Sequence, residues 1–579
     1  MSSANENEMI QSLLDRVATG RLSRRRFMAV VGAAGLTAGL GGGLLGAMAD
    51  QAFAAGDNQA ANQAKLEDAY DYIVVGAGAS GAIVAGDLSK TGAKVLVIES
   101  GGADTAPTIS NPSVWFYNVG GPLDWKLPIT PVPQLDNRKF NMALGRVLGG
   151  GSSINAMVWS RGLKRDYDAW ERGGAKGWGF KDVLPTYKAQ EDWEGGANEW
   201  RGAGGPVHVR TPGDPHPTAP AFIEAARQMG FPVIDDMNGP MRAGAGYINM
   251  NIAADGTRVS SSRAFLRPNL DRPNLTLALN TNVTKVVFDG DRASGVEINT
   301  ADGTRNIRAT REVILAAGAI NTPKLLMLSG VGDAVQLQKL GIKPLANLRG
   351  VGQNLQDHVL VSGVVYQYKG TMPNRPADSN AVDAEVYLSS GVDSHSTDIN
   401  LVLEQLPIAT PEAAARFGAP PKEGFTIAPA LVQPTSRGHV RLASADWRDA
   451  PIIEGNYLGT DRDLAAIVRA IEVARELGSK HALDSVREAE VVPGPKATSR
   501  QDLIELARTA AASFGHAVGT AKIGTGDDAV VDSELRVRGV RGLRVADTSV
   551  MPSIISGPTN AAAFMIGSRA AGFIKATQS

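Results

Sequence analysis

The sequence predicts an α/β protein with a Rossmann-like dinucleotide-binding domain, and two neighbouring patterns carry that prediction. A β-branched run at 71–75 is followed at once by small residues at 76–81, in the pattern Gly-x-Gly-x-x-Gly. A second apolar run at 94–98 ends in Glu99, 18 residues beyond the last of these glycines. A strand, a glycine-rich turn and a helix, followed by a second strand with a terminal carboxylate, are typical of a dinucleotide site.

Each glycine of the turn has its own role. Gly76 permits the tight turn, Gly78 lets a pyrophosphate approach the backbone, and Gly81 lets the helix pack closely against the strand. The phosphates would lie at the positive end of the helix dipole. Glu99 would accept hydrogen bonds from both ribose hydroxyls. The motif by itself fits either FAD or NAD.

Composition excludes several other classes of protein. The chain has 579 residues, enough for more than one domain, and its 58 basic and 59 acidic residues give a net charge of −1. We therefore expect no nucleic-acid partner, because such proteins carry a clustered basic excess. There are no cysteines, which excludes disulfides, thiolate nucleophiles and cysteine-held metals. No metal site is predicted.

The first 54 residues have the pattern of an export signal. Residues 23–28 read Ser-Arg-Arg-Arg-Phe-Met, a glycine- and alanine-rich apolar run follows to Met48, and 52–54 read Ala-Phe-Ala. A twin-arginine pattern, an apolar run and a small-x-small cleavage site are typical of a cleaved twin-arginine signal peptide. A membrane helix is the alternative, but the many glycines make a poor span. We expect a periplasmic or secreted protein whose mature chain has no stable membrane span.

Three later blocks extend the nucleotide motif. Residues 145–161 read Gly-Arg-Val-Leu-Gly-Gly-Gly-Ser-Ser-Ile-Asn-Ala-Met-Val-Trp-Ser-Arg, and 318–332 read Gly-Ala-Ile-Asn-Thr-Pro-Lys-Leu-Leu-Met-Leu-Ser-Gly-Val-Gly. The third block is His-Ala-Val-Gly-Thr at 516–520, followed by Leu-Arg-Val-Ala-Asp-Thr-Ser-Val-Met-Pro at 543–552. Together, from about Tyr70 to the C-terminus, these motifs resemble the glucose–methanol–choline (GMC) family of FAD-dependent oxidoreductases.

The resemblance implies a fold and a division into domains. The fold is α/β, with a Rossmann-like FAD-binding domain and a second α+β substrate domain built on an antiparallel sheet. We expect residues 70–165, 206–356 and 511–579 to form the FAD-binding domain, and residues 166–205 and 357–510 to form the substrate-binding domain. Trp170, Trp178, Trp193 and Trp200 are expected to pack in a core rather than to stack on a substrate.

The resemblance also implies which residues line the FAD site. In addition to the three glycines of the turn, they are Ala79, Ser80, Glu99, Gly151, Asn155, Ala156 and Val158, with the Val283 backbone at the adenine and Asp547 near the ribityl–flavin region. Some family members attach FAD covalently through a histidine at the position of Ile154. Isoleucine cannot form that bond, so we expect FAD to bind non-covalently.

The chemistry implied is oxidation of an alcohol to a carbonyl. A base removes the hydroxyl proton, and hydride passes to flavin N5. A neutral imidazole suits the base because its unperturbed pKa lies near neutrality. Of seven histidines, His516 occupies the position of the family's catalytic histidine. A helix expected to begin near Asn560 would direct its positive end toward the negative charge on the reduced flavin.

One departure from the family concerns a second catalytic residue. Family members pair the histidine with a His or Asn about 42 to 44 residues later, and that position here is Pro558. Proline has no donor, so a hydrogen bond worth about 1 kcal/mol is missing. Asn560, two residues on, is the candidate substitute, and a water or a side chain from elsewhere in the fold is the alternative.

Three functions compete on this evidence. The first is an exported alcohol dehydrogenase, favoured over an oxidase, whose electrons pass to a quinone, a cytochrome or oxygen. The second is a hydroxynitrile-lyase-like member that keeps FAD without net redox. The third is a flavin-binding module without turnover, suggested by Pro558. The sequence fixes neither the alcohol nor the oligomeric state, since one fold serves many substrates.

Overall fold

A computed structural model describes residues 66–240, 243–301, 303–392 and 397–577. The predicted signal segment, residues 1–54, lies outside this part of the chain. Among the described residues, no helix has the length and apolar character needed to cross a membrane.

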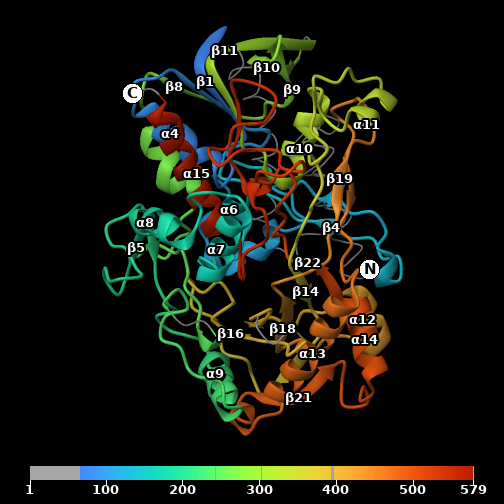
Figure 1. Cartoon of the computed structure of the whole chain (residues 1–579). Coiled ribbons are helices and arrows are strands. Elements are labelled where there is room, and N and C mark those ends of the chain that lie inside the picture. The colour runs from blue at the N-terminus through green and yellow to red at the C-terminus, as the bar shows by residue number, and fades with distance from the viewer. Residues whose placement is uncertain (1–65, 241–242, 302, 393–396, 578–579) are drawn as a thin grey trace, which may run out of the picture.

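One half of the molecule is built on a mostly parallel sheet, seen at the top of Figure 1. The central strands are buried along their apolar stretches at 72–75 and 95–98, as in a parallel sheet that is covered on both faces. The strand order is β8 (Leu275–Ala278), β2 (Val95–Ile98), β1 (Ala69–Val75), β11 (Gly303–Leu315), β10 (Arg292–Thr300) and β9 (Val283–Asp289), and β23 (Leu543–Val545) pairs with β11. β11 is parallel to β1 along its second half and antiparallel to β10 along its first. The predicted Rossmann-like sheet is confirmed.

Three helices meet this sheet where its strands end. α4 (Gly81–Ser89) begins directly after the glycine-rich turn, and α10 (Gly318–Leu328) follows β11. α15 (Asn560–Ala576) packs beside α4, and Figure 1 shows the two side by side at the left. The Ser80 hydroxyl links them by donating a hydrogen bond to the Ala563 carbonyl (2.7 Å). The helix expected near Asn560 thus begins at that residue.

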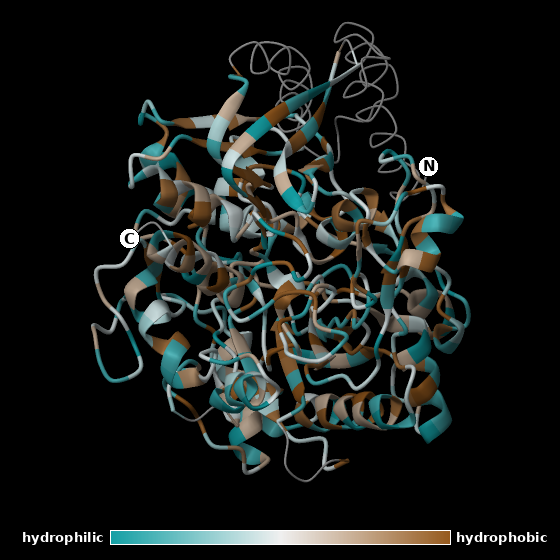
Figure 2. Cartoon of the chain, turned by 45° about the horizontal axis from the view of Figure 1, so that its top comes forward, coloured by the Kyte–Doolittle hydropathy of each residue, from teal (hydrophilic) through white to brown (hydrophobic). Residues whose placement is uncertain are grey.

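The other half is built on an antiparallel sheet, in the lower part of Figure 1. Helices α9 (Thr218–Gln228), α13 (Asp461–Gly478) and α14 (Arg500–Ala510) pack with this sheet in a second hydrophobic core. Figure 2 shows hydrophobic residues gathered on the interior strands of the molecule and hydrophilic ones toward its outside. The strand order is β21 (Arg487–Val492), β15 (Val365–Tyr368), β18 (Gly424–Leu431), β17 (Ile399–Glu404), β16 (Ala384–Leu388) and β7 (Gly244–Tyr247), and β14 (Val359–Val361) pairs with both β18 and β22 (Ala511–Ser513).

The expected domain limits differ from the observed sheets in two places. β7 and β22 belong to the antiparallel sheet, although 206–356 and 511–579 were expected in the FAD-binding domain. Conversely, α7 (Lys164–Arg172) and α8 (Phe180–Gln190), expected in the substrate domain, pack in the core of the nucleotide half. Strands of three or four residues carry too little pattern to show which sheet they join.

Two tryptophans of the 166–205 segment show why this segment packs against the nucleotide half. Trp170 and Trp178 are fully buried, and their indole N–H groups donate to the carbonyls of Ser553 and Ser533, both at 2.9 Å. Each bond ties the 166–205 segment to the C-terminal part of the nucleotide half. Core packing, rather than substrate stacking, is therefore the role of these two side chains.

Shorter elements complete the described chain. They are α5 (Pro107–Ser110), α6 (Gly151–Ile154), α11 (Ala334–Lys339), α12 (Pro411–Phe417), β3 (Leu127–Pro128), β4 (Asn141–Met142), β5 (Glu191–Trp193), β6 (Val207–Val209), β12 (Val331–Gly332), β13 (Ala346–Asn347), β19 (His439–Arg441) and β20 (Ile452–Glu454).

Candidate active site

A cavity of about 920 Å³ is lined by residues from both halves of the molecule. From the nucleotide half it is lined by the β1–α4 turn, Glu99, residues of the 145–158 segment, the start of α10, Asp547 and the first residues of α15. From the antiparallel sheet it is lined by side chains of β16 and β17, and His516 lies on its wall. Most of the residues predicted for the FAD site therefore face one space.

Backbone meets backbone at the glycine-rich turn. Gly76 has φ +98°, and a Cβ placed there would lie 2.5 Å from the Ala316 carbonyl oxygen. A Cβ on Gly81 would lie 1.9 Å from the Gly76 oxygen, and one on Gly150 would lie 2.7 Å from the Cα of Gly78. The turn and the 149–151 loop form a wall almost without side chains, which lets a flat ring or a pyrophosphate lie against the backbone.

Glu99 lies at the end of β2, as its position in the sequence predicts. Its carboxylate accepts hydrogen bonds from the amides of Ala77 (3.0 Å) and Gly101 (2.8 Å), one at each oxygen. Burial raises the pKa of Glu99, and these amides oppose that rise. Each oxygen keeps a lone pair, so the carboxylate can still accept bonds from ribose hydroxyls.

A buried arginine, Arg258, which no sequence motif indicates, holds the 151–158 segment in place. The Asn155 side-chain oxygen accepts from the Met157 amide (3.0 Å) and from the Arg258 guanidinium (2.7 Å). Arg258 also donates to the Ile109 carbonyl (2.7 Å), and burial lowers its pKa to about 9. Gly151, Ala156 and Val158 line the cavity beside Asn155.

Two further residues of the expected FAD site, Val283 and Asp547, also line the cavity. Val283, at the first position of β9, lines it beside Thr281 and Asn282. Asp547 is buried and accepts hydrogen bonds from the Gly318 amide (2.9 Å) and the Thr322 hydroxyl. It thereby fixes the start of α10 at the cavity wall.

Strand pairing positions His516 next to a second histidine. β14 and β22 are antiparallel, with Val359 opposite Ser513, so the residue before β14 lies beside the residues after β22. His358 is that residue. Its Nδ1 lies 2.9 Å from Nδ1 of His516, and its Nε2 lies 3.0 Å from the Ile555 carbonyl oxygen. No sequence motif indicates this pair, because 158 residues separate its members.

These contacts assign the proton on each ring. A carbonyl only accepts, so Nε2 of His358 carries a proton, and its Nδ1 in the neutral ring is an acceptor. His516 must then donate from Nδ1, which leaves a free lone pair on its Nε2. Burial and the neighbouring His358 lower the pKa of His516 well below its usual value. The His516 ring is therefore neutral at pH 7, and its Nε2 is able to accept a proton.

Asp357 fixes the backbone of the same turn. Its carboxylate accepts from the His516 amide (2.8 Å), the Tyr457 hydroxyl (2.7 Å) and the Ser513 hydroxyl. Burial raises the pKa of Asp357 to about 6 despite these bonds. The ring of Phe514 lies 4.6 Å from that of His516, centroid to centroid. His516 is thus held by its amide, by its Nδ1 and by a packed aromatic ring.

Pro558 and Asn560 both line the cavity at the start of α15. The Asn560 side-chain nitrogen is buried and has no hydrogen-bond partner in the described chain, and no side chain caps this helix. An unpaired donor at a helix N-terminus fits an acceptor-rich ring such as a flavin. With the glycine wall and the free lone pairs of Glu99, the cavity fits FAD.

Comparison with known proteins agrees with this geometry. Residues 70–360 match the model of the GMC oxidoreductase N-terminal domain, and residues 434–567 match that of the GMC oxidoreductase C-terminal domain. The chain belongs to the GMC oxidoreductase family. It is a FAD-dependent oxidoreductase that acts on CH–OH groups, and the predicted fold class is confirmed.

GMC relatives match almost the full length of the described chain. An oxygen-dependent choline dehydrogenase of Sinorhizobium medicae is 38% identical over 535 residues, which cover 88% of this chain and 96% of that protein. The mitochondrial choline dehydrogenase of Mus musculus is 37% identical over 540 residues, 88% of this chain and 90% of that protein. The crystal structure of pyridoxine 4-oxidase from Mesorbium loti superposes with a TM-score of 0.82 at 31% identity, over 87% of this chain and 98% of that one. A structure of formate oxidase from Aspergillus oryzae superposes with a TM-score of 0.80 at 26% identity, over 88% of this chain and 98% of that one.

Proposed function

We propose that the protein oxidises a small-molecule alcohol to a carbonyl with His516 as the general base. The observation that carries the proposal is the His358–His516 contact (2.9 Å), which leaves Nε2 of His516 unprotonated in the wall of the cavity. FAD, when bound in the cavity, supplies the hydride acceptor at its N5. His516 takes the hydroxyl proton on Nε2 as the carbon–hydrogen bond breaks, and the carbonyl product leaves.

The residues around His516 support this assignment. His358 keeps the proton on Nδ1 of His516, and Asp357 holds its backbone amide, so the base is oriented before the substrate arrives. Asn560 is proposed to hold the cofactor or the substrate oxygen through its unpaired amide. Pro558 cannot donate a hydrogen bond to the substrate. His358 contacts His516, and we do not assign it the role of the second catalytic residue that is missing at Pro558.

We further propose that FAD is held non-covalently, because Ile154 offers no atom for a covalent bond. The proposed route to the periplasm or the exterior is the twin-arginine pathway, on the basis of residues 23–28 and 52–54. A dehydrogenase that passes electrons to a quinone or a cytochrome is favoured over an oxidase by that location. The names of the relatives include both dehydrogenases and oxidases.

The test is loss of oxidised-flavin absorbance without oxygen, across a panel of alcohols. At least one alcohol should bleach the flavin and yield an equivalent of carbonyl product. Adding a quinone analogue, cytochrome c or air afterwards should restore the colour, and the relative rates identify the acceptor class. A compound that turns over without bleaching would support the lyase alternative and overturn alcohol oxidation.

A further inference from the structure

A buried arginine lies directly behind the part of the cavity wall that residues 151–158 form. Arg258 is 3% exposed, and its guanidinium donates to the carbonyls of Ile109 (2.7 Å) and Ser152 (3.2 Å). It also donates to the side-chain oxygen of Asn155 (2.7 Å). Its Nη2 atom is buried and has no hydrogen-bond partner in the described chain. Asn155 lines the cavity and Arg258 does not, so the asparagine lies between the guanidinium and the cavity.

The charge of Arg258 has no carboxylate to balance it. Other buried arginines of the protein do have such a partner, since Arg201 pairs with Glu191 (3.0 Å) and Arg544 pairs with Glu312 (2.6 Å). Among the described residues, no carboxylate forms an ion pair with Arg258. Burial is the cause that lowers its pKa to about 9, and the group is therefore still protonated at pH 7.

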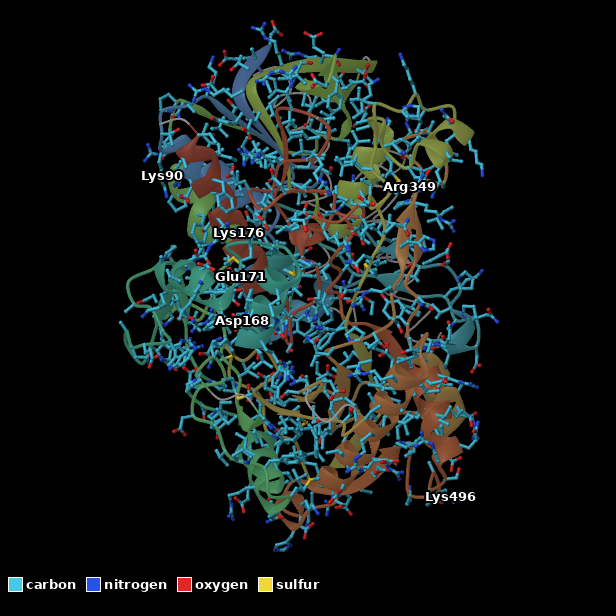
Figure 3. The ribbon with its side chains drawn as sticks, in the orientation of Figure 1. Lys90, Asp168, Glu171, Lys176, Arg349 and Lys496 are labelled. Atoms are coloured by element: carbon cyan, nitrogen blue, oxygen red, sulfur yellow. The ribbon has the colours of Figure 1, made fainter. Side chains whose placement is uncertain are left out.

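Cations elsewhere in the molecule are screened or offset. Lys90 and Arg349, labelled in Figure 3, are exposed to solvent, which screens their charges. Arg146, which lines the cavity, lies close enough to Glu99 to oppose the rise in the pKa of that carboxyl. Arg258 differs from both kinds, because its charge is neither exposed to water nor close to an acid.

The guanidinium also determines which way the Asn155 amide points. A guanidinium and a backbone amide only donate, so the atom that faces Arg258 and the Met157 N–H (3.0 Å) is the side-chain oxygen of Asn155. The Nδ2 group of Asn155 forms no hydrogen bond within the described chain. Because this residue lines the cavity, its amide offers donors rather than an acceptor to a group bound there.

The segment that carries Asn155 lies beside the one that carries His516. Val158 and Phe514 pack against the same buried cluster, which includes Met157. The Phe514 ring lies 4.6 Å from that of His516, and both segments line one cavity. A flavin ring that receives hydride from a substrate held at His516 would therefore lie near Asn155 and near the charge behind it.

Reduction changes the charge of a flavin. An alcohol that becomes a carbonyl gives a hydride to flavin N5 and a proton to the base, so the ring gains two electrons and one negative charge. A fixed positive charge in a wall that excludes water lowers the free energy of the negatively charged form, and it has little effect on the neutral oxidised form. Hydrogen-bond donors directed at the ring act in the same direction.

We propose that Arg258 raises the reduction potential of bound FAD, through its buried and unbalanced charge and through the Asn155 donors that it directs at the cavity. Arg258 is a positioning residue in this role, because it does not line the space that the cofactor and substrate would occupy. The proposal goes beyond alcohol oxidation. It requires FAD to bind, but it does not depend on which substrate reduces the flavin.

The test measures the two-electron reduction potential of the purified FAD-loaded enzyme against an indicator dye, with no alcohol present. Arg258→Met removes the charge from a side chain of similar length and should shift the equilibrium toward oxidised flavin at least tenfold, or about 30 mV. Arg258→Lys, which keeps the charge, should retain most of the wild-type potential. Arg308→Met, at an exposed arginine of β11, is the matched control and should leave the potential unchanged.

A second variant balances the charge without removing the arginine. Asn155→Asp keeps the shape of the side chain and places a carboxylate oxygen against the guanidinium, so a buried ion pair replaces the unbalanced charge. This variant should also shift the equilibrium at least tenfold toward oxidised flavin, and it tests the proposal even where Arg258→Met does not fold. The Kd for sulfite, which adds to flavin N5 and leaves the ring negatively charged, should weaken at least tenfold in the same variants.

Two results would overturn the proposal. One is a wild-type potential in Asn155→Asp or in a folded, FAD-loaded Arg258→Met, and the other is an equal shift in the Arg308→Met control. Because no alcohol is present, these results do not depend on the proposed function. Failure of every alcohol to bleach the flavin would overturn the proposed function and would leave the dye and sulfite measurements unaffected.

Discussion

The two ends of the cavity differ in what forms their walls: backbone at one end and side chains at the other. At the nucleotide end the wall is backbone, because Gly76, Gly81 and Gly150 leave no room for a Cβ. At the end formed by the antiparallel sheet the wall is side chains, with Glu385, Glu404 and the ring of Phe514 facing the cavity. The first end suits a cofactor of constant shape, and the second suits a substrate that is recognised by charge and size.

The two ends also differ in how their polar groups are satisfied. Glu99 and Asp547 are hydrogen-bonded within the fold, so the nucleotide end is organised before any ligand binds. On the antiparallel sheet, Oε2 of Glu404 is buried without a hydrogen-bond partner in the described chain. An unpaired buried group costs free energy, about 1–3 kcal/mol, which a ligand that pairs with it would recover.

The largest expected effect is at the base itself. His516→Ala should lower kcat/KM by about 10³-fold, within the range of general-base catalysis, while FAD stays bound. Steady-state kinetics and the flavin absorbance of the purified variant check this. Unchanged turnover would support the flavin-binding module without catalysis.

A change in the glycine wall should instead remove the cofactor. Gly150 has φ 55° and ψ −133°, and a Cβ there would lie 2.7 Å from the Cα of Gly78, which is backbone and cannot rotate away. Gly150→Ala should weaken FAD binding by about 10- to 100-fold, the equivalent of 1–3 kcal/mol of strain. Gly92→Ala is the control, since it shares a positive φ but meets nothing within 4 Å. FAD content after gel filtration is the measurement, and equal FAD content in both variants would contradict the prediction.

The partner of the base should have an intermediate effect. His358→Leu leaves Nδ1 of His516 without its acceptor and should lower kcat about 10- to 100-fold. His358→Gln, which can accept from His516 and donate to Ile555, should recover part of that loss. Rapid-reaction kinetics of flavin bleaching gives the rate, and identical rates in the two variants would show that His358 does not orient the base.

The pH profile sharpens the same point. Because the folded-state pKa of His516 is lowered, kcat/KM should stay constant as pH falls through 6.5 and decline only at lower pH, where Nε2 becomes protonated. His358→Leu removes one of the two causes of that lowering and should move the declining limb to higher pH. If kcat/KM of the wild-type enzyme already declines at or above pH 6.5, the lowered pKa of His516 is contradicted.

The smallest expected effect is on stability, at a glycine that the fold does not require. Gly572 lies on the exposed side of α15, and a Cβ there meets nothing within 4 Å. Gly572→Ala should raise the free energy of unfolding by about 0.5–1 kcal/mol without changing activity. Denaturant titration measures the change, and a loss of stability would mean that the helix packs differently at this position.

Local pattern predicted much of the nucleotide half. The expected strands at 71–75 and 94–98 correspond to β1 (Ala69–Val75) and β2 (Val95–Ile98), and the helix expected near Asn560 begins there. Domain limits were less predictable, because β7 is four residues long and joins a sheet whose other strands follow far along the chain. The export segment remains a prediction from sequence.

The sequence by itself determined the family, the cofactor and His516 as the candidate base, because each depends on residues that lie close together along the chain. Only the tertiary structure decided which groups meet across long separations. It paired His358 with His516 through β14 and β22, and it placed Glu404 in the same cavity, where Oε2 of its carboxylate has no partner among the described residues. The physical reason is that strand register, set by packing of the whole sheet, determines which side chains share a face.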